Sequence, residues 1–130
     1  MPLYGPNFWR IFREKNKFSV QTSLKFGIKA LEILEKIHAK KIIHQDLKPE
    51  NFVLNLHDLT KIHLIDFGLS KTLKNESKIP NKEEGYCGNT IYMSVNAYME
   101  METCQRDDLE SLGYILVEFM KGSLPWRNGK

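Results

Sequence analysis

Residues 44–68 read HQDLKPENFVLNLHDLTKIHLIDFG, and the interpretation of the whole chain depends on this stretch. Two short apolar runs, residues 52–54 and 62–65, are rich in strand-forming side chains, and the polar residues between them suit a turn. The stretch therefore predicts a β-hairpin. A polar cluster at residues 44–51 precedes this hairpin, and a second one, Asp-Phe-Gly at residues 66–68, follows it.

The two polar clusters together resemble a known signature. The first has the pattern H-x-D-x-K-x-x-N and the second is D-F-G, which are the catalytic-loop and metal-loop motifs of protein kinases. Either motif alone is ordinary, since D-F-G suits any strand-to-turn junction and Asp-Leu-Lys-Pro suits a helix end or turn. Both motifs in this order, with strand-like runs between them, favour the kinase interpretation over a coincidental loop.

The resemblance implies a role for each polar residue, and elementary chemistry supports each role. The carboxylate of Asp46 would accept the proton of a hydroxyl nucleophile, and Lys48 would offset negative charge on the phosphate being transferred. The amide oxygen of Asn51 and the carboxylate of Asp66 would bind Mg²⁺, which prefers oxygen ligands and bridges the phosphates of ATP. Gly68 would let the backbone turn sharply behind Asp66.

Length and composition restrict the class of protein. The chain has 130 residues and a formal net charge of +3, which fits one domain at most and suits acidic protein substrates better than nucleic acid. Cys87 and Cys104 form no disulfide framework, and the sequence has neither an apolar run of membrane-spanning length nor a signal peptide. We therefore expect an intracellular protein, in the cytoplasm, the nucleus or both, without a membrane segment.

The first forty residues predict an extended piece followed by two helices. Residues 1–6 contain two prolines and a glycine, Asn7 can cap a short helix, and Ser19 can cap a long helix that runs to about Lys40. Apolar residues at helical spacing predict one buried stripe along the long helix. They are Leu24, Ile28, Leu31, Leu34 and Ile37.

The four histidines are assigned no metal or catalytic role. His38 is expected to be a surface or helix-end residue, and His44 is expected to be a packed structural residue that follows a short strand at residues 42–43. His57 is expected to be exposed in the hairpin turn, and His63 is expected on the solvent face of the hairpin. Neither of the last two has a cysteine or carboxylate partner at metal-binding spacing.

The second half of the chain begins with a polar segment. Residues 70–84 show no periodicity, and their lysines are either a solvated face or a docking strip for an acidic substrate. A helical turn is expected near residues 97–101. A strong helix is expected from Asp108 to about Met120, with Gly113 at a close helix approach and Gly122 at its end. Its expected buried residues are Leu109, Leu112, Ile115, Leu116 and Phe119.

Residues 88–126 strongly resemble the casein kinase I family of protein kinases. Ser-Val-Asn at residues 94–96 stands where that family has Ser-Ile-Asn and most kinases have Ala-Pro-Glu. RDDLESLGY at residues 106–114 and GSLPW at residues 122–126 match the start and end of the family's next helix. Lys48 followed by proline also resembles the serine/threonine branch. The resemblance covers essentially all 130 residues.

This resemblance implies a fold and an ATP site. The fold is α+β and mainly α: the large, C-terminal lobe of a protein kinase, with short β-hairpins and with the N-terminal lobe absent. Leu3 and Tyr4 match the hinge that holds adenine, Val53 the position under the adenine ring, and Ile65 the residue before the metal-binding aspartate. Structural support is implied for His44, Gly68, Asn89 and Asp108, and Asp108 would accept backbone N–H bonds from the catalytic loop.

Three residues depart from the family pattern. Gln45 replaces the arginine that normally pairs with a phosphate in the activation segment, and a neutral amide cannot form that charge-assisted bond. Asn89 replaces a threonine that bonds the catalytic Asp and Lys. Ile91 replaces an arginine that helps bind anionic groups on primed substrates, so preference for primed or acidic sites is in question.

Two functions follow from these observations. The first is a serine/threonine protein kinase of casein kinase I type that transfers phosphate from MgATP to proteins. The second is an inactive, truncated kinase or pseudokinase that binds proteins. The expected absence of the N-terminal lobe, with its glycine-rich loop, lysine and glutamate, and of the last helices predicts that residues 1–130 alone are not a working kinase, and that a partner covers the surfaces left exposed.

Overall fold

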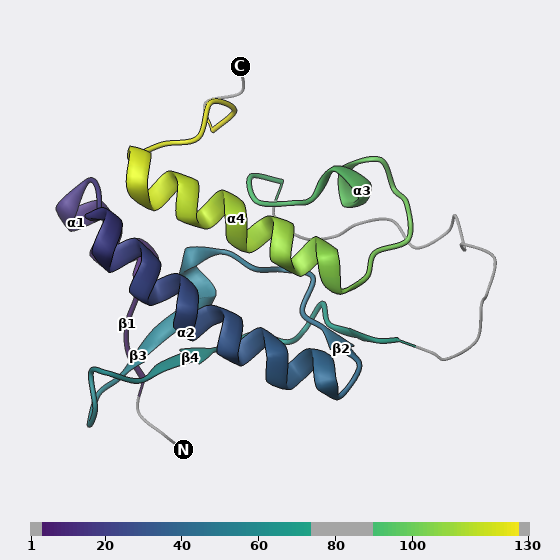
Figure 1. Cartoon of the computed structure of the whole chain (residues 1–130), viewed down its shortest axis with the longest axis horizontal. Coiled ribbons are helices and arrows are strands. Elements are labelled where there is room, and N and C mark those ends of the chain that lie inside the picture. The colour runs from purple at the N-terminus through teal and green to yellow at the C-terminus, as the bar shows by residue number, and fades with distance from the viewer. Residues whose placement is uncertain (1–3, 74–89, 128–130) are drawn as a thin grey trace.

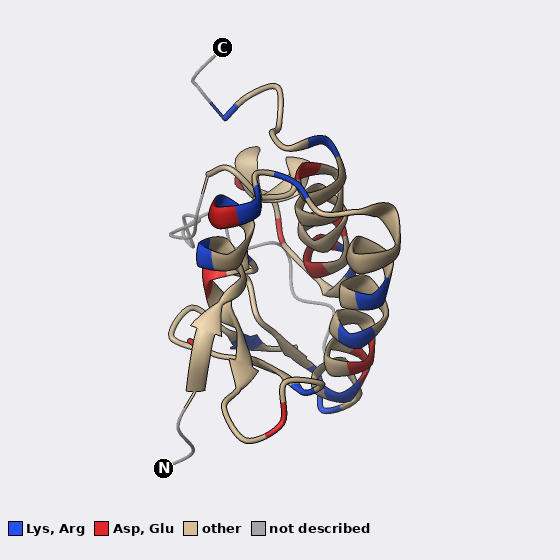
Figure 2. Ribbon diagram, turned by 90° about the vertical axis from the view of Figure 1, so that its left-hand side faces the viewer, with Lys and Arg blue, Asp and Glu red and all other residues tan. Residues whose placement is uncertain are grey.

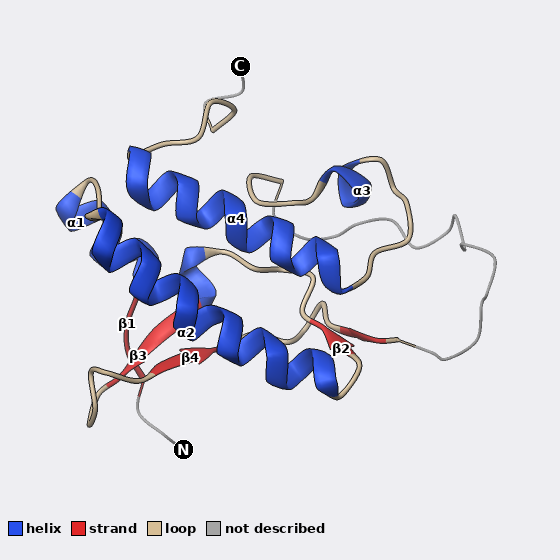
Figure 3. Ribbon diagram, viewed as in Figure 1, coloured by secondary structure: helices blue, strands red, loops and turns tan. Residues whose placement is uncertain are grey.

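Two long antiparallel helices organise the computed structural model, which describes residues 4–73 and 90–127 (Figure 1). Helix α2 packs against α4 and also contacts strand β4. The helices are α1 (Phe8–Lys15), α2 (Val20–Ala39), the 3₁₀ turn η1 (Pro49–Asn51), α3 (Val95–Tyr98) and α4 (Gln105–Lys121). The strands are β1 (Tyr4–Asn7), β2 (Ile42–Ile43), β3 (Phe52–Asn55), β4 (Ile62–Leu64) and β5 (Lys71–Thr72). More residues lie in helices than in the short strands (Figure 3), as expected for a mainly α protein.

Side-chain caps start the first two helices where the sequence predicts them. The Asn7 carboxamide oxygen accepts a hydrogen bond from the Arg10 N–H at 2.9 Å, and the Ser19 hydroxyl oxygen accepts one from the Thr22 N–H at 3.1 Å. Each bond satisfies a backbone donor that the helix itself leaves unpaired. Both predicted caps are confirmed.

The predicted apolar stripe of α2 is wrong for three of its five residues. Leu24, Ile28 and Leu31 are 52%, 58% and 46% exposed, whereas Leu34 is buried and Ile37 is partly buried. The helix is apolar on more than one side, so spacing alone does not identify the face that packs. The buried face carries mostly small residues, which admit a neighbouring helix. Its members are Ser23, Phe26, Gly27, Ala30 and Leu34.

The close approach of two helices occurs at Gly27 and not at Gly113, where the sequence predicted it. A Cβ added at Gly27 would lie 3.2 Å from two carbon atoms of Leu116 on α4, whereas a Cβ added at Gly113 would meet nothing within 4 Å. Gly27 therefore permits α2 and α4 to pack.

Helix α4 begins at Gln105, three residues before the predicted start at Asp108. The side chain of Asp107 accepts a hydrogen bond from the Cys104 N–H at 2.7 Å and so caps the first turn. Leu109 was predicted to be buried and is exposed, while Gly122 ends the helix as predicted, with a φ of 94°. Of the other predicted core residues, Leu112, Ile115 and Phe119 are buried and Leu116 is partly buried.

Aromatic side chains form the centre of the core. Phe119 of α4 packs against Phe18 and Phe26 with ring centroids 4.8 and 5.0 Å apart, and Phe26 lies 5.0 Å from Phe52 of β3. Phe8 of α1 packs on Phe26 at 4.8 Å. These contacts join both long helices, α1 and the hairpin into one hydrophobic core.

The predicted hairpin is present as β3 and β4. Phe52 pairs with Leu64 and Leu54 with Ile62, and β1 adds an antiparallel strand on the other side of β3. His57 is exposed as predicted. His63 is only half exposed, because its ring lies 5.4 Å from that of Tyr4 and its Nε2 lies 3.0 Å from the Asn55 amide nitrogen.

Two other segments differ from the predictions. The polar stretch after Ser70 contains β5, which pairs with β2 and was not predicted, because its partner lies about thirty residues earlier in the chain. The helical turn expected at residues 97–101 is α3 and begins at Val95, where Ser94 caps it. Lys74, Lys78 and Lys82 lie outside the described residues, so their expected role is not tested.

Lysine or arginine residues and aspartate or glutamate residues both occur along the helices, as the blue and red ribbon segments of Figure 2 show, in keeping with the small net charge. None of the helices within residues 4–73 and 90–127 is long and apolar enough to cross a membrane.

Substitutions at Gly113 and Gly27 should have opposite effects on stability. Gly113→Ala should raise the free energy of unfolding by about 0.5–1 kcal/mol, because alanine favours the helix and its Cβ meets open space. Gly27→Val should lower it by about 1–3 kcal/mol, because its side chain overlaps Leu116. Urea unfolding of both variants and the parent chain measures the difference, and a stabilising Gly27→Val would contradict the packing described.

Candidate functional site

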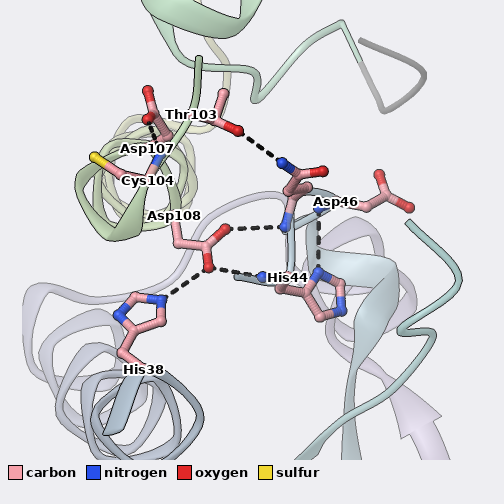
Figure 4. Close-up of polar contacts among 8 residues, drawn as sticks. His38, His44, Asp46, Thr103, Cys104, Asp107 and Asp108 are labelled. Carbon is pink, nitrogen blue, oxygen red and sulfur yellow. Dashed lines mark hydrogen bonds and ion pairs between the residues drawn. The ribbon is translucent and has the colours of Figure 1, made fainter. Parts of the chain in front are cut away.

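The buried carboxylate of Asp108 connects α4 to the loop that follows β2 (Figure 4). One oxygen, Oδ1, accepts a hydrogen bond from the Gln45 N–H at 3.0 Å, and the other, Oδ2, accepts one from the His44 N–H at 2.9 Å. The two backbone bonds expected of Asp108 are therefore present. Because the donors belong to consecutive residues, both carboxylate oxygens hold the same short piece of loop.

His38 lies at the end of α2, one of the two positions predicted for it, and its side chain also binds Asp108. Its Nε2 lies 2.9 Å from Asp108 Oδ2, and its side chain is only 13% exposed. A sequence signal for this position did exist, because His38 follows the buried Leu34 by four residues and so lies on the same face of α2. His38 thus ties the end of α2 to the carboxylate that holds the loop.

His44 is fully buried and is bonded at both ring nitrogens. Its Nδ1 accepts a hydrogen bond from the Asp46 N–H at 3.2 Å, and its Nε2 lies 2.9 Å from the Ile65 carbonyl oxygen. Since a carbonyl can only accept, these partners require the neutral ring with its proton on Nε2. His44 therefore links the loop before the hairpin to the residue that precedes Asp66.

Gln45 adopts a left-handed backbone conformation with a φ of 70°. Such a conformation costs energy for a residue other than glycine, and the Asp108 carboxylate stabilises it by accepting the Gln45 N–H. The Gln45 side chain donates from Nε2 to the hydroxyl oxygen of Thr103 at 2.6 Å. The amide that replaces the family's arginine is thus bonded to the loop before α4.

The sequence predicted a sharp turn at Gly68, but the turn after β4 lies at Asp66. Asp66 has a φ of 60°, while no positive φ occurs at Gly68. The Gly68 N–H instead lies 3.3 Å from Asp66 Oδ1 and donates to it, and a Cβ added at Gly68 would lie 3.2 Å from the same oxygen. Gly68 thus leaves room for the carboxylate and helps to orient it.

The structure brings Asp46, Lys48 and Asn51 together. The Lys48 ammonium lies 3.7 Å from an oxygen of the buried Asp46 carboxylate. The Asn51 amide nitrogen donates to the Asp46 carbonyl oxygen at 2.8 Å, which leaves the amide oxygen as its remaining polar atom. The Ile65 N–H donates to the Asn51 carbonyl at 2.9 Å, so Asp66 follows a residue bonded directly to Asn51.

The oxygen donors in this loop fit a shared magnesium ion better than a complete protein-only metal site. In the described part of the chain, no three His, Cys, Asp or Glu residues form a group able to hold a metal. The Asn51 amide and the exposed Asp66 carboxylate offer oxygen ligands, and Mg²⁺ commonly uses one or two protein oxygens together with water and substrate phosphates.

The residues that match the adenine-binding positions lie on the sheet. Tyr4 pairs with Asn55 across β1 and β3, and Val53, two residues after Asn51, pairs with Asn7 and is buried. Ile65 is half exposed at the end of the hairpin. Leu3 and Asn89 lie outside the described residues.

A second buried polar cluster was not predicted. The fully buried Glu118 of α4 accepts hydrogen bonds from Arg127 at 2.6 and 2.7 Å and from the hydroxyl of Tyr92. Burial and the Glu118 carboxylate raise the pKa of Tyr92, and the bond to Glu118 raises the pKa of Arg127. The Trp126 N–H also donates to the Ile91 carbonyl at 2.7 Å. These contacts fix the segment that follows residue 90 onto α4.

One known family accounts for the motifs and the geometry together. The model of the family described as Protein kinase domain matches residues 3–130. The match includes the loop held by Asp108, the hairpin, Asp66 and both long helices.

Asp108→Asn should lower the free energy of unfolding by about 2–4 kcal/mol. The amide nitrogen cannot accept a hydrogen bond, so one of the buried N–H groups of His44 and Gln45 would lose its acceptor. Hydrogen exchange should accelerate at the His44 and Gln45 amides. Asp58→Asn is the matched control, since its carboxylate is exposed and bonds only within its turn. Unchanged exchange at both amides would contradict the role given to Asp108.

Proposed function

We propose, since the chain belongs to the protein kinase family, that its loop at residues 44–51 catalyses ATP-dependent transfer of a phosphoryl group to serine or threonine side chains of proteins. The observation that carries this proposal is the convergence of Asp46, Lys48 and Asn51 on one loop, with Asp66 next to it.

In this proposal Asp46 accepts the proton of the substrate hydroxyl. The bond from the Asp46 N–H to His44 and the bond from Asn51 to the Asp46 carbonyl hold its backbone on both sides. Lys48, whose ammonium is 3.7 Å from the carboxylate, stabilises negative charge on the transferred group. A fixed base and a fixed cation reduce the rearrangement needed to reach the transition state.

Asn51 and Asp66 would hold magnesium through oxygen atoms, with the phosphates of ATP as further ligands. The bound ion would neutralise charge on those phosphates. The donation from the Asn51 amide nitrogen to the Asp46 carbonyl supports this role, because it fixes which end of the amide remains for a cation. Tyr4, Val53 and Ile65 are proposed to contact adenine.

The casein kinase I type is the finer part of the proposal, and its support comes from the sequence of residues 94–96, 106–114 and 122–126. In the structure these three segments contact one another. The Ser94 hydroxyl donates to Asp107 at 2.6 Å, and the rings of Tyr114 and Trp126 lie 5.2 Å apart. Acidic protein substrates remain part of this proposal, although Ile91 supplies no cation.

A non-catalytic binding module is the alternative. Gln45 and Asn89 depart from the family at positions that support catalysis, and Gln45 is bonded to Thr103. The two functions differ in one measurable respect. A pseudokinase would bind partners without transferring phosphate from radiolabelled MgATP to casein, whereas the kinase would label casein on serine or threonine.

In an active protein that contains this chain, Asp46→Asn should reduce the transfer rate by roughly 100- to 10,000-fold. MgATP affinity should change little, because Asp46 is not among the proposed metal or adenine contacts. Transfer to casein and MgATP titration measure the two effects. Asp58→Asn is the control, and a variant that retains half the parent rate would remove Asp46 from the mechanism.

Activity should not depend on phosphorylation of residues 70–96. The Gln45 amide is neutral and already bonded to Thr103, so it offers no cation to a phosphate on this segment. Phosphatase treatment should leave the transfer rate unchanged in the parent, and the Gln45→Arg variant, which restores a cation, is the matched comparison. A large loss of rate after treatment, mapped to Ser70, Thr72 or Ser77, would contradict the expectation.

A further inference from the structure

Four large apolar side chains are exposed around α3, and we call them the α3 patch. They are Val95, Tyr98, Met99 and Met101, and each is at least 60% exposed. Tyr98 and Met99 follow Val95 by three and four residues, so the three share one face of the helical turn. The Met101 N–H donates to the Asn96 carbonyl at 2.9 Å, which folds the next residues back beside α3.

Single exposed apolar residues are normal on protein surfaces, but a contiguous group is a frequent mark of an interaction site. Methionine and tyrosine are well suited to such sites, because methionine adapts its shape and tyrosine offers a large rigid surface. Figure 1 shows α3 at the edge of the molecule, beyond α4 as seen from α2.

The patch rests on a rigid base, although it is exposed. Glu110 of α4 accepts the Val95 N–H at 2.9 Å, and Ser94 both caps α3 and donates to Asp107 at 2.6 Å. The Asn96 amide, with its oxygen toward Arg106, accepts from that guanidinium at 3.2 and 2.8 Å. Binding to a surface that is already ordered loses less conformational entropy, which favours affinity.

Charge around the patch identifies the kind of partner. Residues 90–105 contain Glu100 and Glu102 but no lysine or arginine, although the chain as a whole carries a net charge of +3. Both glutamates are exposed, and Glu110 lies at the base of the patch. The nearest cation in sequence, Arg106, is engaged with Asn96. Within residues 90–105, the side chains that carry a formal charge are therefore all acidic.

We infer that the α3 patch binds a basic segment of a partner protein, in which large apolar side chains alternate with lysine or arginine. The apolar side chains cover Tyr98, Met99 and Met101, and the cations pair with Glu100 and Glu102. Apolar contact supplies most of the affinity, and the charges select the partner and speed its association. Binding at the α3 patch is separate from the proposed phosphoryl transfer and does not depend on it.

A labelled twelve-residue peptide of alternating leucine and lysine is a direct probe, titrated against the full chain by fluorescence anisotropy in low salt. Met99→Ser/Met101→Ser should weaken binding by about 10-fold or more. Glu100→Gln/Glu102→Gln should weaken it less and flatten its salt dependence. Leu24→Ser, on the exposed side of α2, is the matched control and should not change it. All these positions are exposed, so the variants should keep the parent's fold.

The net charge of the protein is positive and repels a basic peptide, and two further peptides measure any non-specific binding that remains. Glutamate in place of lysine, or serine in place of leucine, should abolish binding. Equal affinity of the parent and the methionine variant would overturn the inference, as would binding of the glutamate peptide. A concentration-dependent dimer of the parent that the methionine variant abolishes would also overturn it, because a second copy would then occupy the patch.

Discussion

The buried carboxylate of Asp108 is the contact on which the arrangement of the site depends. It accepts the backbone N–H groups of His44 and Gln45 and binds the ring of His38, so it joins α4, the loop after β2 and the end of α2. Without that acceptor, the N–H groups of His44 and Gln45 would be unpaired in the interior, and nothing would offset the strain of the left-handed backbone at Gln45. The position of Asp46 follows from this constraint, because it is the next residue.

A second set of contacts connects the loop to the end of the hairpin, where Asp66, a proposed metal ligand, follows. His44 bonds both the Asp46 N–H and the Ile65 carbonyl, and Asn51 bonds the Asp46 carbonyl and the Ile65 N–H. The proposed base and the proposed metal ligands are thus held by the same few hydrogen bonds. In a protein kinase, where transfer depends on the placement of base, metal and phosphate, such a shared frame has a clear purpose.

Local patterns in the sequence predicted local structure well. The caps at Asn7 and Ser19, the hairpin and the helix end at Gly122 each depend on residues close in the chain. The buried face of α2 was not predictable from spacing, because that helix is apolar on several sides. The spacing from Leu34 places His38 on the buried face of α2, but it does not identify Asp108 as its partner. The cluster around Glu118 likewise joins residues far apart in sequence, which no local pattern reveals. The motif at residues 44–51 suggested the proposed chemistry, but only the fold shows how these residues are held.

The most direct test of the account is a crystal structure of a protein that contains this chain, with a non-hydrolysable ATP analogue and Mg²⁺. The account predicts a magnesium ion at about 2.0–2.1 Å from the Asn51 amide oxygen and from the Asp66 carboxylate, with analogue phosphates as further ligands. It also predicts that Asp108 still accepts the His44 and Gln45 amides. A metal bound elsewhere, or a nucleotide that leaves Asn51 and Asp66 without contacts, would contradict it.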